Sequence, residues 1–73
     1  MSRLRVGVIG AGTWGKNHVR ALAGHADAEL VMVCDASEKV RERVARQYPG
    51  VKVTASAAEL LGAVEAVVIA SPA

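Results

Sequence analysis

Short apolar runs alternate along this chain with segments whose apolar residues recur every three or four positions. Residues 4–9 form the first run, which is apolar at most positions and stops before a glycine. Such a run is typical of a strand buried on both faces of a parallel sheet. In residues 13–24, Gly15, Val19 and Leu22 share one face of a helix. The pattern therefore predicts a buried strand followed by a helix.

The same alternation continues through the middle of the chain. Residues 29–34 form a second apolar run. Residues 37–48 then place Val40, Val44 and Tyr48 on one helical face, with charged residues elsewhere. We expect a second buried strand and a second helix in this region.

The last third of the chain predicts a further strand, a short helix and a final strand. Residues 51–54 alternate apolar and polar side chains, which indicates a strand with one face toward water at the edge of a sheet. Residues 56–61 begin with Ser56 and Glu59 at the spacing of a capping box, which favours a short helix. Residues 66–70 are entirely apolar and predict the last strand.

The order of these elements indicates an α/β fold with a parallel sheet and crossover helices. Right-handed crossovers in a doubly wound, Rossmann-like sheet place the four strands in the order 3-2-1-4, with three helices between them. The fourth strand would then be an edge, yet residues 66–70 carry no polar side chain to protect it. We therefore expect the fold to be truncated, with a neighbouring strand following residue 73.

Composition narrows the class of protein. The chain has 73 residues, of which 52% are hydrophobic and 22% charged, so we expect one small domain. No apolar run reaches the length of a membrane span, and a net charge of +2 is too weak for a nucleic-acid or membrane partner. A single cysteine, Cys34, excludes an internal disulfide and a multi-cysteine metal site, which favours a reducing, cytoplasmic location.

The strongest motif is a glycine-rich segment between the first strand and the first helix. Gly10, Gly12 and Gly15 form the pattern G-x-G-x-x-G inside a strand–helix–strand unit. Gly10 permits a tight turn, Gly12 lets a pyrophosphate approach the backbone, and Gly15 allows close helix packing. The alternative is a purely structural turn. A Walker motif is excluded because Asn17 stands where Ser or Thr is required. We favour a dinucleotide site that includes Thr13 and Trp14 of the same loop.

A second candidate site residue follows the second strand. Asp35 lies 20 positions after Gly15, where an acid accepts hydrogen bonds from the adenosine ribose. It could also cap the next helix, and both roles are compatible. A carboxylate here repels a 2′-phosphate, so NAD is preferred over NADP. The next helix contains three arginines, Arg41, Arg43 and Arg46. We interpret them as a solvated helix face rather than as a phosphate-binding group.

These segments together resemble a known family. Residues 8–18, 33–35 and 67–73 closely resemble the corresponding parts of the Gfo/Idh/MocA oxidoreductases, in register over the whole chain. The resemblance implies hydride transfer between a nicotinamide cofactor and a carbon of a sugar or nucleotide sugar, with nucleotide-sugar members looking most similar. It also implies a homo-oligomer and a contact between the cofactor and the last segment, namely Ala70, Ser71 and Pro72.

By the same resemblance, residues 1–73 are the N-terminal part of a dinucleotide-binding domain, with no catalytic residue and no substrate domain. Two alternatives stay open: a nucleotide-binding module without redox activity, and an NAD-dependent glycosidase. Trp14 could shield the cofactor or simply pack against the helix start. Lys16 is interpreted as solvent-exposed and His18 as a polar surface or interdomain residue, rather than as phosphate-binding groups, and Cys34 as a core residue.

Overall fold

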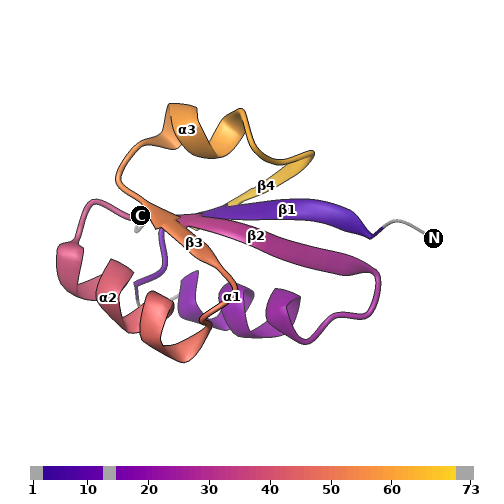
Figure 1. Ribbon diagram of the computed structural model, residues 1–73, viewed down its shortest axis with the longest axis horizontal. Helices are drawn as coiled ribbons and strands as arrows, with labels where there is room; N and C mark the ends of the chain where they lie inside the picture. Colours follow the sequence, from indigo (N-terminus) through magenta and orange to yellow (C-terminus); the bar gives the residue numbers. More distant parts are fainter. Residues whose placement is uncertain (1–2, 13–14, 71–73) are drawn as a thin grey trace.

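A four-stranded parallel sheet with helices on both faces forms the protein (Figure 1). The computed structural model describes residues 3–12 and 15–70. The strands lie in the order β3-β2-β1-β4, which confirms the predicted topology. The elements in chain order are β1 (Leu4–Ile9), α1 (Gly15–Ala23), β2 (Ala28–Cys34), α2 (Glu38–Gln47), β3 (Lys52–Thr54), α3 (Ala57–Leu61) and β4 (Ala66–Ile69).

Every element predicted from the pattern is present, with bounds that differ by one or two residues where they can be compared. The alternating segment is β3, which pairs with β2 along one side, as expected for an edge strand. The predicted start of α1 at Thr13 lies outside the described residues, and the helix is described from Gly15 onward. In the described ranges, no helix combines the length and the apolar character that crossing a membrane would require.

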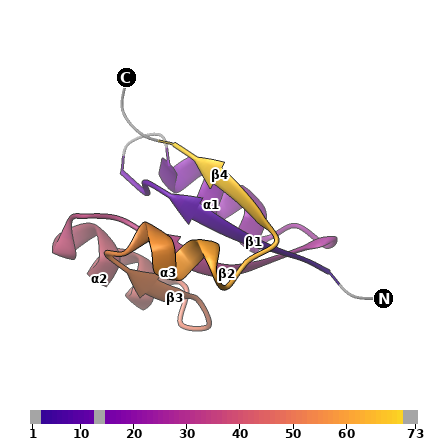
Figure 2. The same ribbon diagram turned by 90° about the horizontal axis from the view of Figure 1, so that it is seen from above.

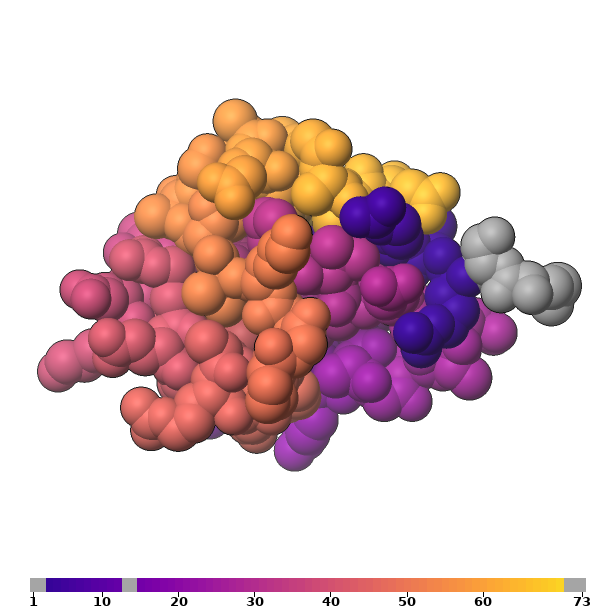
Figure 3. All heavy atoms as spheres, viewed as in Figure 1, coloured from indigo at the N-terminus to yellow at the C-terminus, as the bar shows by residue number. Residues whose placement is uncertain are grey.

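The helices divide the apolar core into two layers. Helices α1 and α2 cover one face of the sheet and α3 covers the other, as the two views in Figures 1 and 2 show. The layer under α1 and α2 is built around Val8, Val33 and Val44, all nearly or fully buried. The layer under α3 is built around Met32 and Leu60. The space-filling view shows the atoms of β3 at the surface between the α2 and α3 layers (Figure 3).

Strand β2 contains an irregularity that its sequence does not reveal. Val6 pairs with Leu30, but the next residue, Gly7, pairs with Met32, so Val31 has no partner of its own in β1. Val31 and Met32 consequently both contact the α3 layer, whereas Leu30 lies in the α1–α2 layer. This is the arrangement of a β-bulge. An uninterrupted apolar run gives no alternation from which such a shift could be predicted.

Serines begin two of the helices. Ser37 is the N-cap of α2, and its Oγ accepts a hydrogen bond from the N–H of Val40 at 3.3 Å. Ser56 caps α3 by accepting from the N–H of Glu59 at 3.2 Å. In a capping box, the Glu59 carboxylate would accept a hydrogen bond directly from the Ser56 N–H. Here Thr54 lies between the two groups: its Oγ1 accepts from the Ser56 N–H and donates to the Glu59 carboxylate. This relay ties the end of β3 to the start of α3.

Helix α3 contacts the sheet closely because β1 has a glycine beneath it. A Cβ atom at Gly7 would lie 2.7 Å from Cδ2 of Leu60, which is closer than side chains tolerate. The missing side chain leaves the space that Leu60 fills, and Leu60 is fully buried as a result. Leu60 is therefore the main anchor of this short helix.

We expect Leu60→Ala to lower the free energy of unfolding by about 2–5 kcal/mol, because it leaves a cavity against Gly7. Leu61→Ala is the matched control: Leu61 is its neighbour in α3 and is 57% exposed, so its loss should change stability by less than about 0.5 kcal/mol. Urea unfolding followed by circular dichroism measures both. Equal effects of the two substitutions would show that α3 is not held by Leu60.

Strand β4 leaves an apolar edge in the described part of the chain. Its four residues are partly or largely exposed, and Ile69 reaches 69% exposure. Each of these edge strands pairs with one described neighbour, but β3 contains the exposed Lys52, whereas β4 contains only apolar residues. Unpaired backbone groups on such an edge can pair with another chain.

A polypeptide of residues 1–73 is therefore expected to self-associate through β4 as its concentration rises. Ile69→Lys should reduce this association, because a charged side chain on an edge strand disfavours pairing between chains. Sedimentation velocity over a concentration series measures the effect. A monodisperse monomer at every concentration would contradict the expectation.

Candidate functional site

The residues that follow three strands meet at one edge of the sheet. Their backbone N–H groups continue the ladders: Gly10 donates to Cys34 O at 2.8 Å, and Asp35 donates to Thr54 O at 3.0 Å. Ala70 donates to Ile9 O at 2.8 Å. In doubly wound sheets, ligands bind outside the carboxyl ends of the strands, where the crossovers change direction. Strands β1 and β4 border that position here.

The glycine loop has the geometry that its spacing predicts. Gly10 adopts a φ of 90°, a conformation that favours glycine. A Cβ at Gly15 would overlap the carbonyl oxygen of Gly10 and would come within 3.6 Å of the Ala70 Cβ. The start of α1 can therefore lie against the ends of β1 and β4 only because residue 15 has no side chain. The structure brings together three predicted site residues, Gly10, Gly15 and Ala70.

Gly12 lies at the open side of this loop. Within residues 3–12 and 15–70, a Cβ there would meet nothing within 4 Å, so open space adjoins the backbone on the side of the described residues. The carbonyl oxygen of Gly12 accepts from the N–H of Lys16 at 3.1 Å, which joins the loop directly to α1. The open space at Gly12 therefore adjoins the N-terminal end of α1, and the N-terminus of a helix favours anions. The other predicted loop residues, Thr13 and Trp14, lie outside the described residues.

Asp35 connects the end of β2 to the glycine loop. Its Oδ2 accepts from the N–H of Ala11 at 2.9 Å, and its Oδ1 accepts from the N–H of Ser37 at 2.8 Å. The N-cap of α2 is Ser37, so the alternative in which Asp35 caps that helix is wrong. An ionised carboxylate has about four acceptor positions. Two are used by these bonds, which leaves capacity for two further donors such as ribose hydroxyls.

Two arginines of α2 approach the same place, which the sequence did not predict. Arg41 Nη1 donates to Asp35 O at 2.7 Å, and Arg43 Nη2 donates to Ala11 O. The interpretation of a solvated helix face is therefore wrong for Arg41, which is half-buried, while Arg43 and Arg46 are exposed as expected; Arg43 also bonds to the glycine loop. The available signal was their position in the first turns of a helix that begins beside the strand ends. Arginine is long enough to reach those ends from there.

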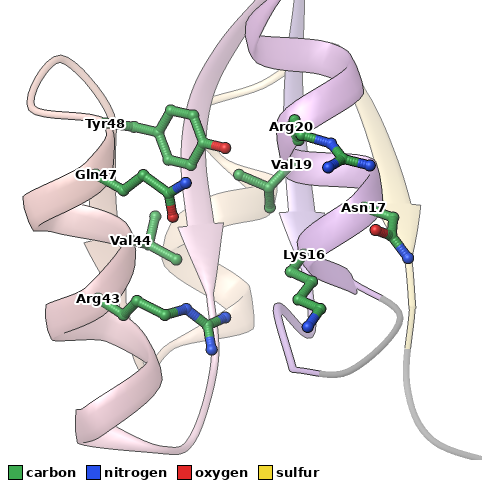
Figure 4. A pocket seen from close by; sticks show the side chains of 8 residues that line it. All are labelled: Lys16, Asn17, Val19, Arg20, Arg43, Val44, Gln47 and Tyr48. Carbon is green, nitrogen blue, oxygen red and sulfur yellow. The ribbon is translucent and has the colours of Figure 1, made fainter.

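A groove of about 280 Å³ separates α1 from α2 (Figure 4). Val19 and Val44 form its apolar floor, and Tyr48 lies at the end away from the glycine loop. Lys16 and Arg43 lie at the end nearest the loop, so positive charge gathers beside the candidate site. Lys16 is exposed, as expected.

The remaining chemically active side chains have structural surroundings. Cys34 is buried in the α3 layer, and burial, followed by the negative charge of Asp35, raises the pKa of its thiol, which confirms it as a core residue. His25 is exposed and accepts from the N–H of Asp27 at 3.1 Å. Among residues 3–12 and 15–70, no cluster of three His, Cys, Asp or Glu could hold a metal ion. Ser71 and Pro72 lie outside the described residues.

Curated proteins similar to this chain include several inositol 2-dehydrogenases. Inositol 2-dehydrogenase of Rhizobium meliloti (strain 1021) is 42% identical over 69 residues, which are 94% of this chain and 21% of that protein. Inositol 2-dehydrogenase 1 of Saccharopolyspora erythraea is 43% identical over 74 residues, again 94% of this chain and 22% of that protein. The chain thus spans about a fifth of the length of these relatives.

Solved structures agree with the sequence matches. GenD2 from gentamicin A biosynthesis, in complex with NAD, superposes with a TM-score of 0.88 at 35% identity, over 100% of this chain and 21% of that one. The WlbA dehydrogenase from Bordetella pertussis, in complex with NADH and UDP-GlcNAcA, gives 0.83 at 32% identity, over 96% and 22%. The model of the Gfo/Idh/MocA family, described as an oxidoreductase family with an NAD-binding Rossmann fold, matches residues 4–73. The chain therefore belongs to the Gfo/Idh/MocA oxidoreductases, as part of their NAD-binding Rossmann domain.

Proposed function

We propose that this chain holds the adenosine and pyrophosphate portion of NAD for an oxidoreductase that acts on a hydroxyl-bearing carbon of a cyclitol, sugar or nucleotide sugar. The observation that carries the proposal is the hydrogen bond between the Asp35 carboxylate and the Ala11 N–H. It joins the ribose-binding candidate to the glycine loop across 24 positions of sequence. The names of the relatives support the substrate class, since they include inositol dehydrogenases and a dehydrogenase bound to UDP-GlcNAcA.

Each described site residue has a distinct task in this proposal. The pyrophosphate lies over Gly12, where open space adjoins the backbone beside the N-terminal end of α1. Gly10 and Gly15 shape the loop, and Asp35 accepts hydrogen bonds from the adenosine ribose with its remaining lone pairs. Ala70, at the end of β4, borders the path toward the nicotinamide half. The family resemblance adds Thr13, Trp14, Ser71 and Pro72 to this set.

The nicotinamide supplies the hydride chemistry when NAD is bound, and this chain holds the cofactor by its adenosine and pyrophosphate portion. We propose that the groups that bind substrate and move its proton lie in the rest of a longer protein, because the chain spans only 21% and 22% of the relatives described above. A cytoplasmic homo-oligomer is the expected form of that protein. NAD-dependent oxidation of inositol or a nucleotide sugar by the full-length protein supports the proposal. Tight NAD binding without turnover would favour a non-catalytic module.

We expect Gly12→Val to weaken NAD binding by about 100-fold, or about 2.7 kcal/mol, because the new side chain fills the space assigned to the pyrophosphate. The fold should be retained, since a Cβ at Gly12 contacts nothing within 4 Å in the described part of the chain. Calorimetric titration of NAD into the full-length protein measures the change.

Gly50→Val is the matched control for that substitution. Gly50 also has open space around its Cβ position, but it follows α2 and precedes β3, at the other end of the sheet. Its substitution should leave NAD affinity within about twofold of the wild type. An unchanged affinity in folded Gly12→Val would remove the cofactor from this loop.

We expect Asp35→Ala to weaken NAD binding by about tenfold and to narrow the gap between NAD and NADP. The carboxylate offers hydrogen bonds to the ribose hydroxyls and repels a 2′-phosphate, so its loss affects the two cofactors in opposite directions. Dissociation constants for both cofactors, measured at one salt concentration, give the result. Wild-type protein that binds NADP as tightly as NAD would contradict the role of Asp35.

A further inference from the structure

Two arginines lie beside the proposed ribose-binding residue, and the proposed function gives them no task. Arg41 donates to the backbone oxygen of Asp35 at 2.7 Å, and Arg43 donates to the backbone oxygen of Ala11. These oxygens belong to the two residues that the Asp35–Ala11 hydrogen bond already joins. Both guanidinium groups therefore lie beside the residue to which the proposed function assigns the adenosine ribose. We call this set, with Asp35 and the N–H groups of Ala11 and Ser37, the Asp35 cluster.

The Asp35 cluster is an anion-binding arrangement occupied by its own carboxylate. Two backbone N–H groups point at the carboxylate, from Ala11 at 2.9 Å and from Ser37 at 2.8 Å. The two guanidinium charges exceed the single carboxylate charge by one. Nearby Lys16, at the same end of the groove, adds to the positive potential (Figure 4). Without the carboxylate, the cluster would present only donors and positive charge.

The two arginines are not equivalent toward a ligand. Arg41 is half-buried against the end of β2, whereas Arg43 is exposed and extends toward the loop from the groove side. A guanidinium carries five N–H donors, and the bond of Arg43 to Ala11 O uses one of them. Arg43 thus has donors available for a phosphate placed at the ribose, and guanidinium–phosphate pairs are among the strong charge-assisted hydrogen bonds.

We propose that Arg43 is a specificity-determining residue that attracts a phosphate group on the adenosine ribose, in opposition to Asp35. The preference for NAD over NADP is then set by two opposing effects on the 2′-phosphate of NADP: repulsion by the Asp35 carboxylate and attraction by the Arg43 guanidinium. The proposal rests on the proposed function, because it takes the ribose to lie at Asp35. It follows that the wild-type protein discriminates against NADP less than a protein with Asp35 alone would.

The test is a double-substitution cycle with calorimetric dissociation constants for NAD and NADP, measured on the full-length protein. Arg43→Ala should weaken NADP binding by about tenfold and NAD binding by less than about threefold. Asp35→Ser should strengthen NADP binding by about tenfold, and Asp35→Ser combined with Arg43→Ala should lose that gain. Arg46→Ala, an exposed residue of the same helix, is the matched control and should change neither cofactor. Arg43→Lys should restore part of the NADP affinity, because it keeps the charge.

Two results would overturn the role of Arg43. Equal weakening of NAD and NADP by Arg43→Ala would make Arg43 a residue that only positions Ala11. A gain in NADP affinity that persists in the double variant would place the phosphate elsewhere. Adenosine 2′-monophosphate separates this proposal from the proposed function, since it reports on the 2′-phosphate without the dinucleotide. Asp35→Ser should bind it about tenfold more tightly than the wild type, and only while Arg43 is present. Failure of the wild type to bind NAD would instead refute the proposed function.

Discussion

The close approach of α1 to the end of β1 is the constraint on which the candidate site depends. No side chain fits between Gly15 and the carbonyl oxygen of Gly10, so the helix begins directly above the strand end. This contact forces the loop into a tight turn, for which Gly10 adopts a positive φ. The turn also brings the N-terminal end of α1 beside the open space at Gly12. Three glycines thus convert a strand–helix junction into a surface that favours an anion.

The second half of the site is placed by the sheet rather than by the loop. Parallel pairing of β1 with β2 brings Cys34 level with Ile9, so the next residues, Gly10 and Asp35, emerge side by side. The hydrogen bond from Ala11 to Asp35 then fixes the loop against the end of β2. The site is therefore assembled from backbone pairing first and side-chain chemistry second. The position of Asp35 relative to Gly10 therefore depends on the pairing of β1 with β2.

Features that depend on the local pattern of residues could be predicted from the sequence. The strand–helix order, the edge character of β3 and the role of Gly15 all follow from spacing within one or two elements. The contacts of Arg41 and Arg43 were missed because a long flexible side chain can reach several partners, and position along the helix does not select one. The bond from Arg43 joins residues 32 positions apart. Only the tertiary arrangement defines such a contact.

The bulge in β2 has a consequence for how this strand can vary in length. Between Leu30 and Val33, two consecutive residues face the α3 layer where a regular strand would have one. Deletion of either Val31 or Met32 would restore simple alternation and leave Leu30, Val33 and the residues after them on their present faces. A deletion anywhere else in β2 would exchange the faces of part of the strand. At this one place, β2 can therefore lose a residue while the carboxylate at its end still faces the glycine loop.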